Sequence, residues 1–249
     1  MIGHNHLGKN GRFGNQMFQY AATRGLAAKH KYDWCIPDGP RTDEEFVDEE
    51  NQHKLFMAFK MEGAKVVKDH PAPYEKEGSF TFDHRLFLYC PDNVNLFGYF
   101  QCEKYFKDIE KEIRQDFTWR DDVRSLCQDM FDSIGGKAIS LHIRRTDHLV
   151  KPTYHPVLPL SYYEKALEII DTLSLDRQKN LPVLVFSDDP EWCHKQEFFS
   201  DDRFMISDSG DNITDMCLMS MCQYQIMANS TYSWWGAWLS DSKNVFGPK

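Results

Sequence analysis

The sequence predicts an α/β protein built on parallel sheets, in a chain of 249 residues. The second half alternates short apolar runs with amphipathic segments, which is the pattern of strands joined by crossover helices. Each apolar run ends in polar residues, and in open α/β sheets ligands bind at the carboxyl ends of the strands. The chain is long enough for two domains. The pair Gly135-Gly136 indicates a hinge, so we expect domains at residues 1–134 and 135–249.

Composition excludes several classes of function. The net charge of −9 argues against a nucleic-acid-binding protein, so a basic cluster would serve a small anion. No apolar run approaches the roughly 18 residues of a membrane helix, and we expect no membrane span. The seven cysteines lack CxxC spacing and lie mostly in apolar stretches. They predict reduced core residues of a cytoplasmic protein.

The first half opens with a glycine-punctuated loop that leads into a helix. Apolar residues at helical spacing place Gly14 and Asn15 at the start of this helix. The glycines do not follow GxGxxG, which disfavours a dinucleotide site. We expect a polar excursion over residues 36–78 with one short helix at 55–61. Further elements of the first half are expected as a strand at 95–100 and helices at 102–117 and 121–134.

The second half predicts five strands with helices between them. A capping box, Ser161 to Glu164, predicts the start of a helix that turns Tyr163 and Ile170 inward. The expected strands, including their polar ends, cover residues 138–143, 182–189, 203–208, 224–229 and 244–247, and two further helices are expected at 211–222 and 230–239.

The strand at 138–143 is the centre of this pattern. Its apolar residues alternate with period two and it runs into Arg144 and Arg145. By alternation His142 and Arg144 share one face, and Arg145 points to the other. A surface ion-pair cluster is one interpretation. Two guanidiniums at the end of a core strand also suit a phosphate, which the planar fork of arginine binds bidentately.

Four strand ends together predict a functional crevice. Ser230 and Thr231 lie where a strand turns into a helix, a corner that binds phosphate through free backbone N–H groups but is also an ordinary N-cap. Asp215 shares an apolar helix face, so it either accepts hydrogen bonds from a guanine edge or favours the helix dipole. The polar residues at the four strand ends are Arg144, Arg145 and Asp147; Ser187, Asp188 and Asp189; Ser207 and Asp208; and Asn229 and Ser230.

A magnesium or manganese site is the alternative for the acidic pairs. Asp188 and Asp189 have the oxygen ligands these metals prefer, although they could also cap a turn. The arginines supply the positive charge that a diphosphate leaving group otherwise takes from a metal, so we expect no required metal.

Five motifs resemble the α-1,2-fucosyltransferase family, and they occur in its order across nearly the whole chain. They are Gly11-Arg-Phe-Gly-Asn-Gln-Met-Phe-Gln-Tyr20, Gly98-Tyr-Phe-Gln-Cys-Glu-Lys-Tyr-Phe106, His142-Ile-Arg-Arg-Thr-Asp147, Phe186-Ser-Asp-Asp189 and Asn229-Ser-Thr-Tyr-Ser-Trp-Trp-Gly-Ala-Trp-Leu239. The motifs are also similar to those of core α-1,6-fucosyltransferases and protein O-fucosyltransferases. The resemblance implies a GT-B-like fold of two Rossmann-like α/β/α domains facing a central cleft, and an inverting, metal-independent use of GDP-fucose without a further cofactor.

The resemblance also implies residue roles. Arg145 would hold the β-phosphate with Arg144 beside it, and Arg12 and Asn15 would lie between donor and acceptor. His142 and Asp215 match guanine-reading positions. The remaining donor-side positions are Ser230, Thr231 and Ser233 at phosphate contacts, with Asp188, Asp189 and Asn229 at the donor-binding edge.

Two departures keep the linkage and the general base open. Thr146 stands where most α-1,2 members have Gly, which is more similar to the α-1,6 group. The stretch that carries a catalytic glutamate in those relatives is shorter here and has no acid. Asp147, then His148, are the candidate bases, because both follow the arginines. A reaction without a side-chain base is the alternative.

The sequence thus predicts transfer of fucose from GDP-fucose to a glycan, with residues 1–134 on the acceptor side and 135–249 binding the donor. The expected acceptor is O-2 of a terminal β-galactoside, bound by loops around residues 37–78 and 149–160. The alternatives are an α-1,6- or O-fucosyltransferase, an enzyme using another GDP-sugar, and a GDP-sugar-binding protein without turnover.

Overall fold

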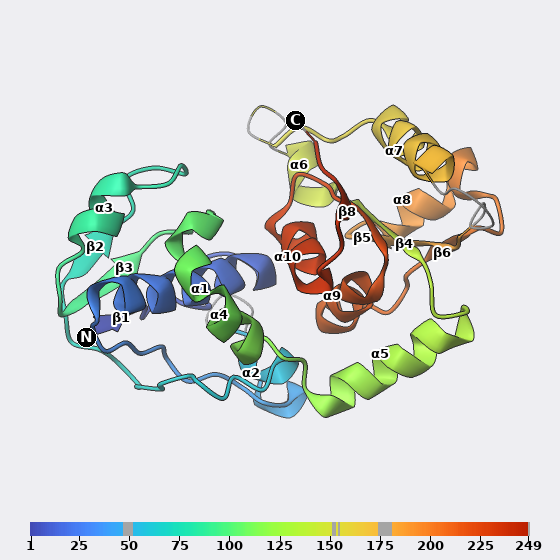
Figure 1. Cartoon of the computed structure of the whole chain (residues 1–249). Helices are drawn as coiled ribbons and strands as arrows, with labels where there is room; N and C mark the ends of the chain where they lie inside the picture. The colour runs from blue at the N-terminus through green and yellow to red at the C-terminus, as the bar shows by residue number, and fades with distance from the viewer. Residues whose placement is uncertain (47–51, 151–152, 154, 174–180, 249) are drawn as a thin grey trace. The chain divides into compact units, whose positions relative to one another are not determined.

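The computed structural model describes residues 1–46, 52–150, 153, 155–173 and 181–248. It divides into two compact units, Met1–Arg120 and Asp121–Lys249 (Figure 1). The predicted boundary lay after residue 134. The difference arises because the helix α5, Asp121–Ser133, packs on the helix α9 of the second unit. The hinge glycines lie inside that unit, and both have positive φ, 92° at Gly135 and 67° at Gly136.

The second unit is a five-stranded parallel sheet in the order β6-β5-β4-β7-β8 (Figure 1). The strands are β4 Ile139–Ile143, β5 Val183–Ser187, β6 Phe204–Ile206, β7 Tyr224–Ile226 and β8 Asn244–Phe246. In register, Ile143 pairs with Ser187 and Leu141 pairs with Ile226. All five predicted strands and their shared edge are therefore confirmed.

Helices cover both faces of this sheet. Alternate residues of β4 and β5 form one core with α7 (Leu160–Leu173) and α8 (Pro190–His194). Figure 1 shows α9 (Asn212–Met221) and α10 (Thr231–Ser240) together on the other side of the strands. A short helix, α6 (Thr146–Val150), follows the arginines directly. Because α7 begins at Leu160, Ser161 lies inside the helix, and the predicted capping box is wrong. The inward residues Tyr163 and Ile170 are buried as predicted.

The first unit holds a three-stranded parallel sheet in the order β1-β3-β2. Its strands are β1 Ile2–Gly3, β3 Val94–Phe97 and β2 Tyr74–Lys76, of which β2 falls where the sequence predicted only an excursion. Its main helix is α1, Phe13–His30, which starts at the predicted glycine-rich loop. Two shorter helices are α2 (Leu55–Ala58) and α3 (His84–Tyr89). Residues 47–51 of the predicted acidic stretch lie outside the described residues.

The predicted helix over 102–117 is instead two 3₁₀ turns and the short helix α4, Glu110–Asp116. The adjacent residues Tyr105 and Phe106 are both 1% exposed. Tyr105 packs on Phe100 and Phe106 on Phe18. The backbone of this segment also lies close to α1, because a Cβ on Gly25 would be 2.1 Å from the carbonyl oxygen of Tyr105.

Candidate functional site

The turn after β4 is held by a single carboxylate. Asp188, at the end of β5, accepts hydrogen bonds from the backbone N–H groups of Arg145 at 2.8 Å and Thr146 at 3.1 Å, and from the Thr146 hydroxyl. Burial opposes ionisation of Asp188, but the bonds from Thr146 and the charge of Arg144 outweigh it and lower its pKa. The ends of two adjacent strands are thus tied together by an ionised side chain.

Arg144 lies between two carboxylates. Its Nη2 is 2.8 Å from Oδ1 of Asp147 and its Nη1 is 3.2 Å from Oδ2 of Asp188. The pKa of Asp147 is lowered because its bond to Arg144 outweighs partial burial. The charge of Arg144 is therefore balanced within the protein. For this arginine, the interpretation of the pair as an ion-pair cluster is the one that fits.

Arg145 is held differently. Its Nε pairs with Oδ2 of Asp189 at 3.2 Å, and its guanidinium lies 3.8 Å from the ring centroid of Trp192. Nη1 and Nη2 make no hydrogen bond or ion pair with the residues that the structure describes. Trp192 belongs to α8, which covers the face opposite to His142, so the predicted alternation of the two arginines is confirmed. The result is a fixed, stacked guanidinium with the outer half of its fork unpaired.

Asp188 and Asp189 were both expected at the donor. In the structure each is engaged with the arginine turn, and Asp189 also caps α8 by accepting from the Trp192 N–H at 3.2 Å. Their observed contacts are those of residues that orient the arginines.

The other face of β4 carries a buried imidazole. His142 is 3% exposed, and its ring lies 5.5 Å from that of Tyr232 on α10. Burial, reinforced by the charge of Arg144, lowers the pKa of His142 to about 3, so the ring is neutral at pH 7. Its Nδ1 is enclosed without a hydrogen-bond partner among the described residues. An unpaired polar atom in a core costs stability, and a ligand can relieve that cost.

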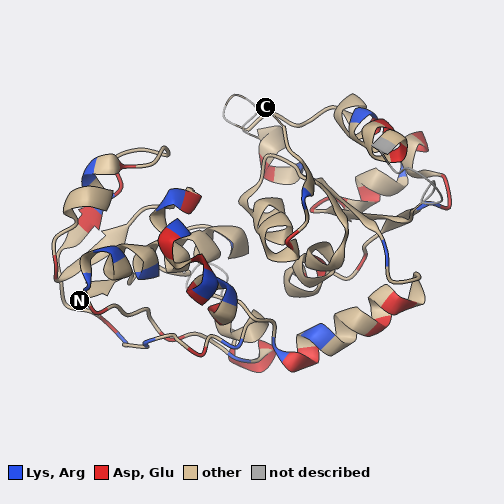
Figure 2. Cartoon of the chain, in the orientation of Figure 1, with Lys and Arg blue, Asp and Glu red and all other residues tan. Residues whose placement is uncertain are grey.

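Asp215 is the one charged residue of α9, and Figure 2 shows α10 without any. It accepts hydrogen bonds at Oδ1 from Ser207 at 2.6 Å and Ser209 at 2.8 Å. Burial raises its pKa, although both hydroxyls oppose this. The prediction that Asp215 turns inward is confirmed, and two serines that follow β6 orient it.

The corner after β7 has the predicted geometry of a helix start. Ser230 is the N-cap of α10 and its hydroxyl accepts from the Tyr232 N–H at 3.3 Å, while Thr231 is the first helical residue. The Ser233 hydroxyl is buried and donates to the carbonyl of Ala228 at 3.3 Å. Asn229 donates to the carbonyl of Pro156 at 2.9 Å, so it anchors the segment before α7.

In the first unit, Arg12 is the N-cap residue of α1 and is exposed. Its side chain makes no ion pair with the described residues. Asn15 is fixed next to it by Gln101, which donates at 2.9 Å. A Cβ on Gly11, whose φ is 86°, would lie 2.3 Å from the Asn15 amide, so glycine is needed here.

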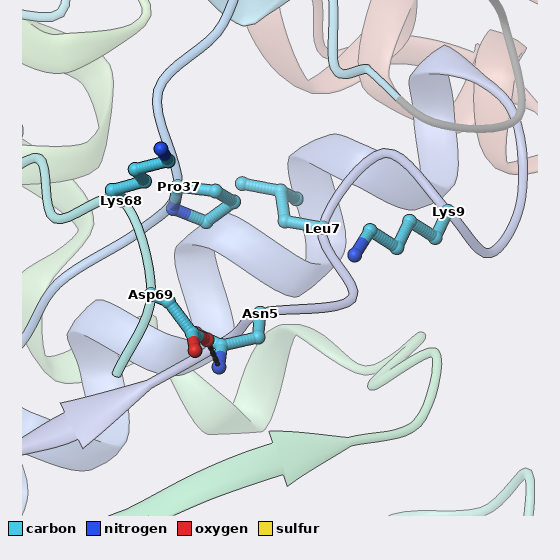
Figure 3. Close-up of a pocket in the computed structure, with 6 residues that line it drawn as sticks. All are labelled: Asn5, Leu7, Lys9, Pro37, Lys68 and Asp69. Carbon is cyan, nitrogen blue, oxygen red and sulfur yellow. Dashed lines mark hydrogen bonds between the residues drawn. The ribbon is translucent and has the colours of Figure 1, made fainter. Parts of the chain in front are cut away.

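The first unit also has a half-open cavity of 590 Å³ (Figure 3). On one wall the side-chain amide of Asn5 donates a hydrogen bond to Asp69. Lys9 and Lys68 add two positively charged side chains to the lining. Leu7 and Pro37 give it an apolar wall. Pro37, Lys68 and Asp69 come from the excursion at 36–78 that the sequence singled out as an acceptor loop.

The described residues form neither a metal cluster nor a membrane-spanning helix. No group of three or more His, Cys, Asp or Glu side chains is arranged to hold a metal ion. None of the described helices has the length and apolar character needed to cross a bilayer.

Trp192 is a site residue that the sequence does not single out, as are Ser209 and His155. Its only sequence signal is that it follows Asp188-Asp189-Pro190, a helix start at a strand end.

Solved structures show what kind of protein has this architecture. The chain matches NodZ α-1,6-fucosyltransferase co-crystallised with GDP, with a TM-score of 0.60 and 13% identity over 94% of this chain and 90% of that one. It also matches POFUT1 in complex with GDP, with a TM-score of 0.57 and 11% identity over 99% and 97% of the two chains. The fold is thus the GT-B-like α/β fold of these fucosyltransferases.

Sequence comparison then gives the family. The model of glycosyl transferase family 11 matches residues 1–246, and the chain belongs to that family. It is 30% identical to the O-antigen biosynthesis glycosyltransferase WbnK of Escherichia coli, over 96% of this chain and 92% of that protein. It is 29% identical to an α-1,2-colitosyltransferase of Escherichia coli, over 93% and 86%. Identity to the galactoside α-(1,2)-fucosyltransferase 1 of Rattus norvegicus is 25%, over 95% of this chain and 63% of that protein.

Proposed function

We propose that this glycosyltransferase moves L-fucose from GDP-fucose to O-2 of a terminal β-galactoside, with inversion and without a metal ion. The second unit, Asp121–Lys249, would bind the donor and the first unit the acceptor. The observation that carries the proposal is the state of Arg145, a fixed guanidinium at the carboxyl edge of a parallel sheet whose outer nitrogens have no partner among the described residues. That edge is where α/β folds bind nucleotides.

The donor assignment rests on two further features of the same edge. Ser230 and Thr231 offer hydroxyls and first-turn N–H groups of α10 to the diphosphate. Asp215, oriented by two serines, is a hydrogen-bond acceptor for a guanine edge, and the enclosed Nδ1 of His142 lies on the same side of the sheet. The solved relatives named above were crystallised with GDP.

The proposed reaction is a displacement at the anomeric carbon. The acceptor oxygen forms a bond to C1 of fucose, the bond from C1 to the phosphate oxygen breaks, and the electron pair leaves with GDP. Arg145, with Arg144 and the Ser230 corner, stabilises the charge that develops on the diphosphate. Because the unpaired outer nitrogens of Arg145 and the first-turn N–H groups of α10 face that charge, the proposed reaction does not need a metal.

The proton of the acceptor hydroxyl needs a destination. Asp147 and His148 were the expected candidates. Asp147 forms an ion pair with Arg144, which weakens it as a base. His148 is 4% exposed, and its Nδ1 has no hydrogen-bond partner among the described residues. A general base histidine is usually held by a partner on one ring nitrogen so that the other can accept a proton, and Nδ1 of His148 lacks such a partner in the described part of the chain.

The acceptor assignment rests on the relatives and on the first unit. One of the relatives is named as a galactoside α-(1,2)-fucosyltransferase, and another as an α-1,2-colitosyltransferase. The cavity of Figure 3 pairs an apolar wall with a carboxamide and a carboxylate, a lining that suits a sugar, and Arg12 stands exposed at the start of α1. All seven cysteines are free, which supports a cytoplasmic enzyme.

A colitosyl donor is the second candidate, because of the 29% identity to an α-1,2-colitosyltransferase. Transfer from GDP-fucose and GDP-colitose in direct competition separates the two.

The test of the donor site is GDP binding by calorimetry and fucose transfer, in Arg145→Ala beside Arg124→Ala. Arg124 is an exposed arginine on α5 of the same unit and serves as the matched control. Arg145→Ala should weaken GDP binding and lower turnover about a hundredfold or more, as loss of one oxyanion donor does. Arg124→Ala should change neither. Equal effects of the two variants would contradict the proposal.

A further inference from the structure

A stacked histidine pair lies beside the arginine turn. The ring of His148 on α6 faces that of His155 at a centroid distance of 5.1 Å, with an angle of 16° between the planes. Three residues, or about 4.5 Å of helical rise, separate Arg145 from His148. The pair is therefore a short distance past the proposed phosphate site, on the same edge of the sheet.

The segment that carries His155 is held from both sides of the proposed phosphate clamp. The stack joins it to α6, which follows Arg145. The hydrogen bond from Asn229 to the carbonyl of Pro156 joins it to the Ser230 corner. His155 is exposed, and it makes no hydrogen bond or ion pair with the residues that the structure describes.

The described carboxylates of this edge are already engaged. Asp147, Asp188 and Asp189 pair with the arginines. Asp215 accepts from two serines, Asp208 faces His194 at 3.3 Å, and Asp211 caps α9. Using any of them as a base would give up an arginine, a helix cap, a guanine contact or, for Asp208, its contact with His194.

We infer that His155 is the general base of the transfer reaction and that His148 is its positioning residue. The inference rests on the proposed function. As the acceptor oxygen bonds to C1 of fucose, its proton moves to a ring nitrogen of His155, while the electron pair of the breaking C1–O bond leaves with GDP. The positive charge that forms on His155 is stabilised by Asp147 and Asp188, the carboxylates near His148.

The charged groups around the stack fit this role. His148 is neutral because burial lowers its pKa, against the opposing charge of Asp147. The charges of Arg144 and His155 also lower the pKa of His148, and the smaller effect of Asp188 opposes them. A neutral stacked ring positions His155 without competing for the proton. Asp147 forms an ion pair with Arg144, so its role is to hold that arginine in place.

The experiment measures kcat, KM, the pH profile and GDP affinity for His155→Ala, with His84→Ala as the control. His84 is an exposed histidine of the first unit that contacts the ring of Phe82. We expect kcat of His155→Ala to fall about a hundredfold, the range of general base catalysis, with GDP affinity within about twofold of the parent. The acid limb of kcat/KM should disappear, and added imidazole should restore part of the rate. His84→Ala should keep the parent's values.

A second variant guards against a folding defect. His155→Gln keeps a planar polar group that can stack but cannot take a proton at neutral pH, so it should lose turnover as His155→Ala does while its melting temperature stays that of the parent. The inference is overturned if either variant keeps more than a third of the parent kcat. It is also overturned if the acid limb persists and imidazole has no effect. Failure of the proposed function gives a different result, because GDP then does not bind the parent protein.

Discussion

Trp192 gives a sharp test of how Arg145 is held. The guanidinium carbon of Arg145 lies over the indole ring, 3.8 Å from its centroid, and its Nε is fixed by Asp189 at 3.2 Å. A cation–π contact of this kind contributes about 0.5–2 kcal/mol, depending on desolvation. Arg145 is 15% exposed at its side chain, which places the contact toward the upper half of that range. Replacing Trp192 with Leu should thus lower kcat/KM by roughly 8- to 30-fold, since about 1.4 kcal/mol corresponds to a factor of ten.

The assay is fucose transfer at subsaturating GDP-fucose, with the melting temperature as a check on the fold. Trp192→Phe retains an aromatic face and is the matched control, so it should keep most of the activity. Trp192→Leu keeps apolar bulk against the core of α7 and α8, which limits the loss of stability. Activity of the Leu variant equal to that of the Phe variant would refute the claim that the aromatic face orients Arg145.

Three other perturbations have defined outcomes. Asp188→Asn removes the charge that pairs with Arg144 but keeps a hydrogen-bond acceptor for the turn. We expect kcat to fall at least tenfold and the melting temperature to change little. A kcat equal to that of the parent would show that the turn does not need the charge. Asp215→Asn should weaken GDP binding at least tenfold but leave the affinity for inorganic pyrophosphate unchanged, and equal losses for both ligands would rule out a guanine contact. His142 has a folded pKa of about 3, against about 6.5 unfolded, so its stabilising effect is complete above pH 6.5 and is lost as the pH falls toward 3. The loss at pH 5 is about 2 kcal/mol, and a denaturant titration of His142→Gln should show a pH dependence weaker by that amount; an unchanged dependence would contradict a buried neutral His142.

The central strand and its two arginines could be predicted from the sequence, because strand periodicity fixes which face each residue takes. The alternation placed Arg145 opposite His142, and the structure confirms this through Trp192 on one face and Tyr232 on the other. The shared edge followed because parallel strands joined by right-handed crossovers end on one side. These are local rules, and they suffice for the frame of the site.

The partners of the arginines could not be predicted from the sequence. Asp188 and Asp189 looked like ligands of a donor or a metal, and only the register of β4 against β5 shows that they orient the arginine turn. The stack of His148 and His155 depends on the path of a loop that Asn229, which follows the neighbouring strand β7, anchors. Periodicity contains no such information.

The same limit explains the elements that were predicted wrongly. The segment from 102 to 117 has helical spacing, but close packing of Tyr105 against α1 and of Phe106 against Phe18 imposes two 3₁₀ turns. The strand β2 is three residues long and half exposed, so it lacks the alternating pattern that marks a strand in the sequence.

The most direct test of the account is transfer of radiolabelled fucose from GDP-fucose to a panel of β-galactosides, with EDTA present and with Arg145→Ala alongside. We expect a labelled α-1,2-linked product that forms equally well in EDTA and is lost with Arg145. Transfer that stops in EDTA, or that persists at the parent rate without Arg145, would contradict it.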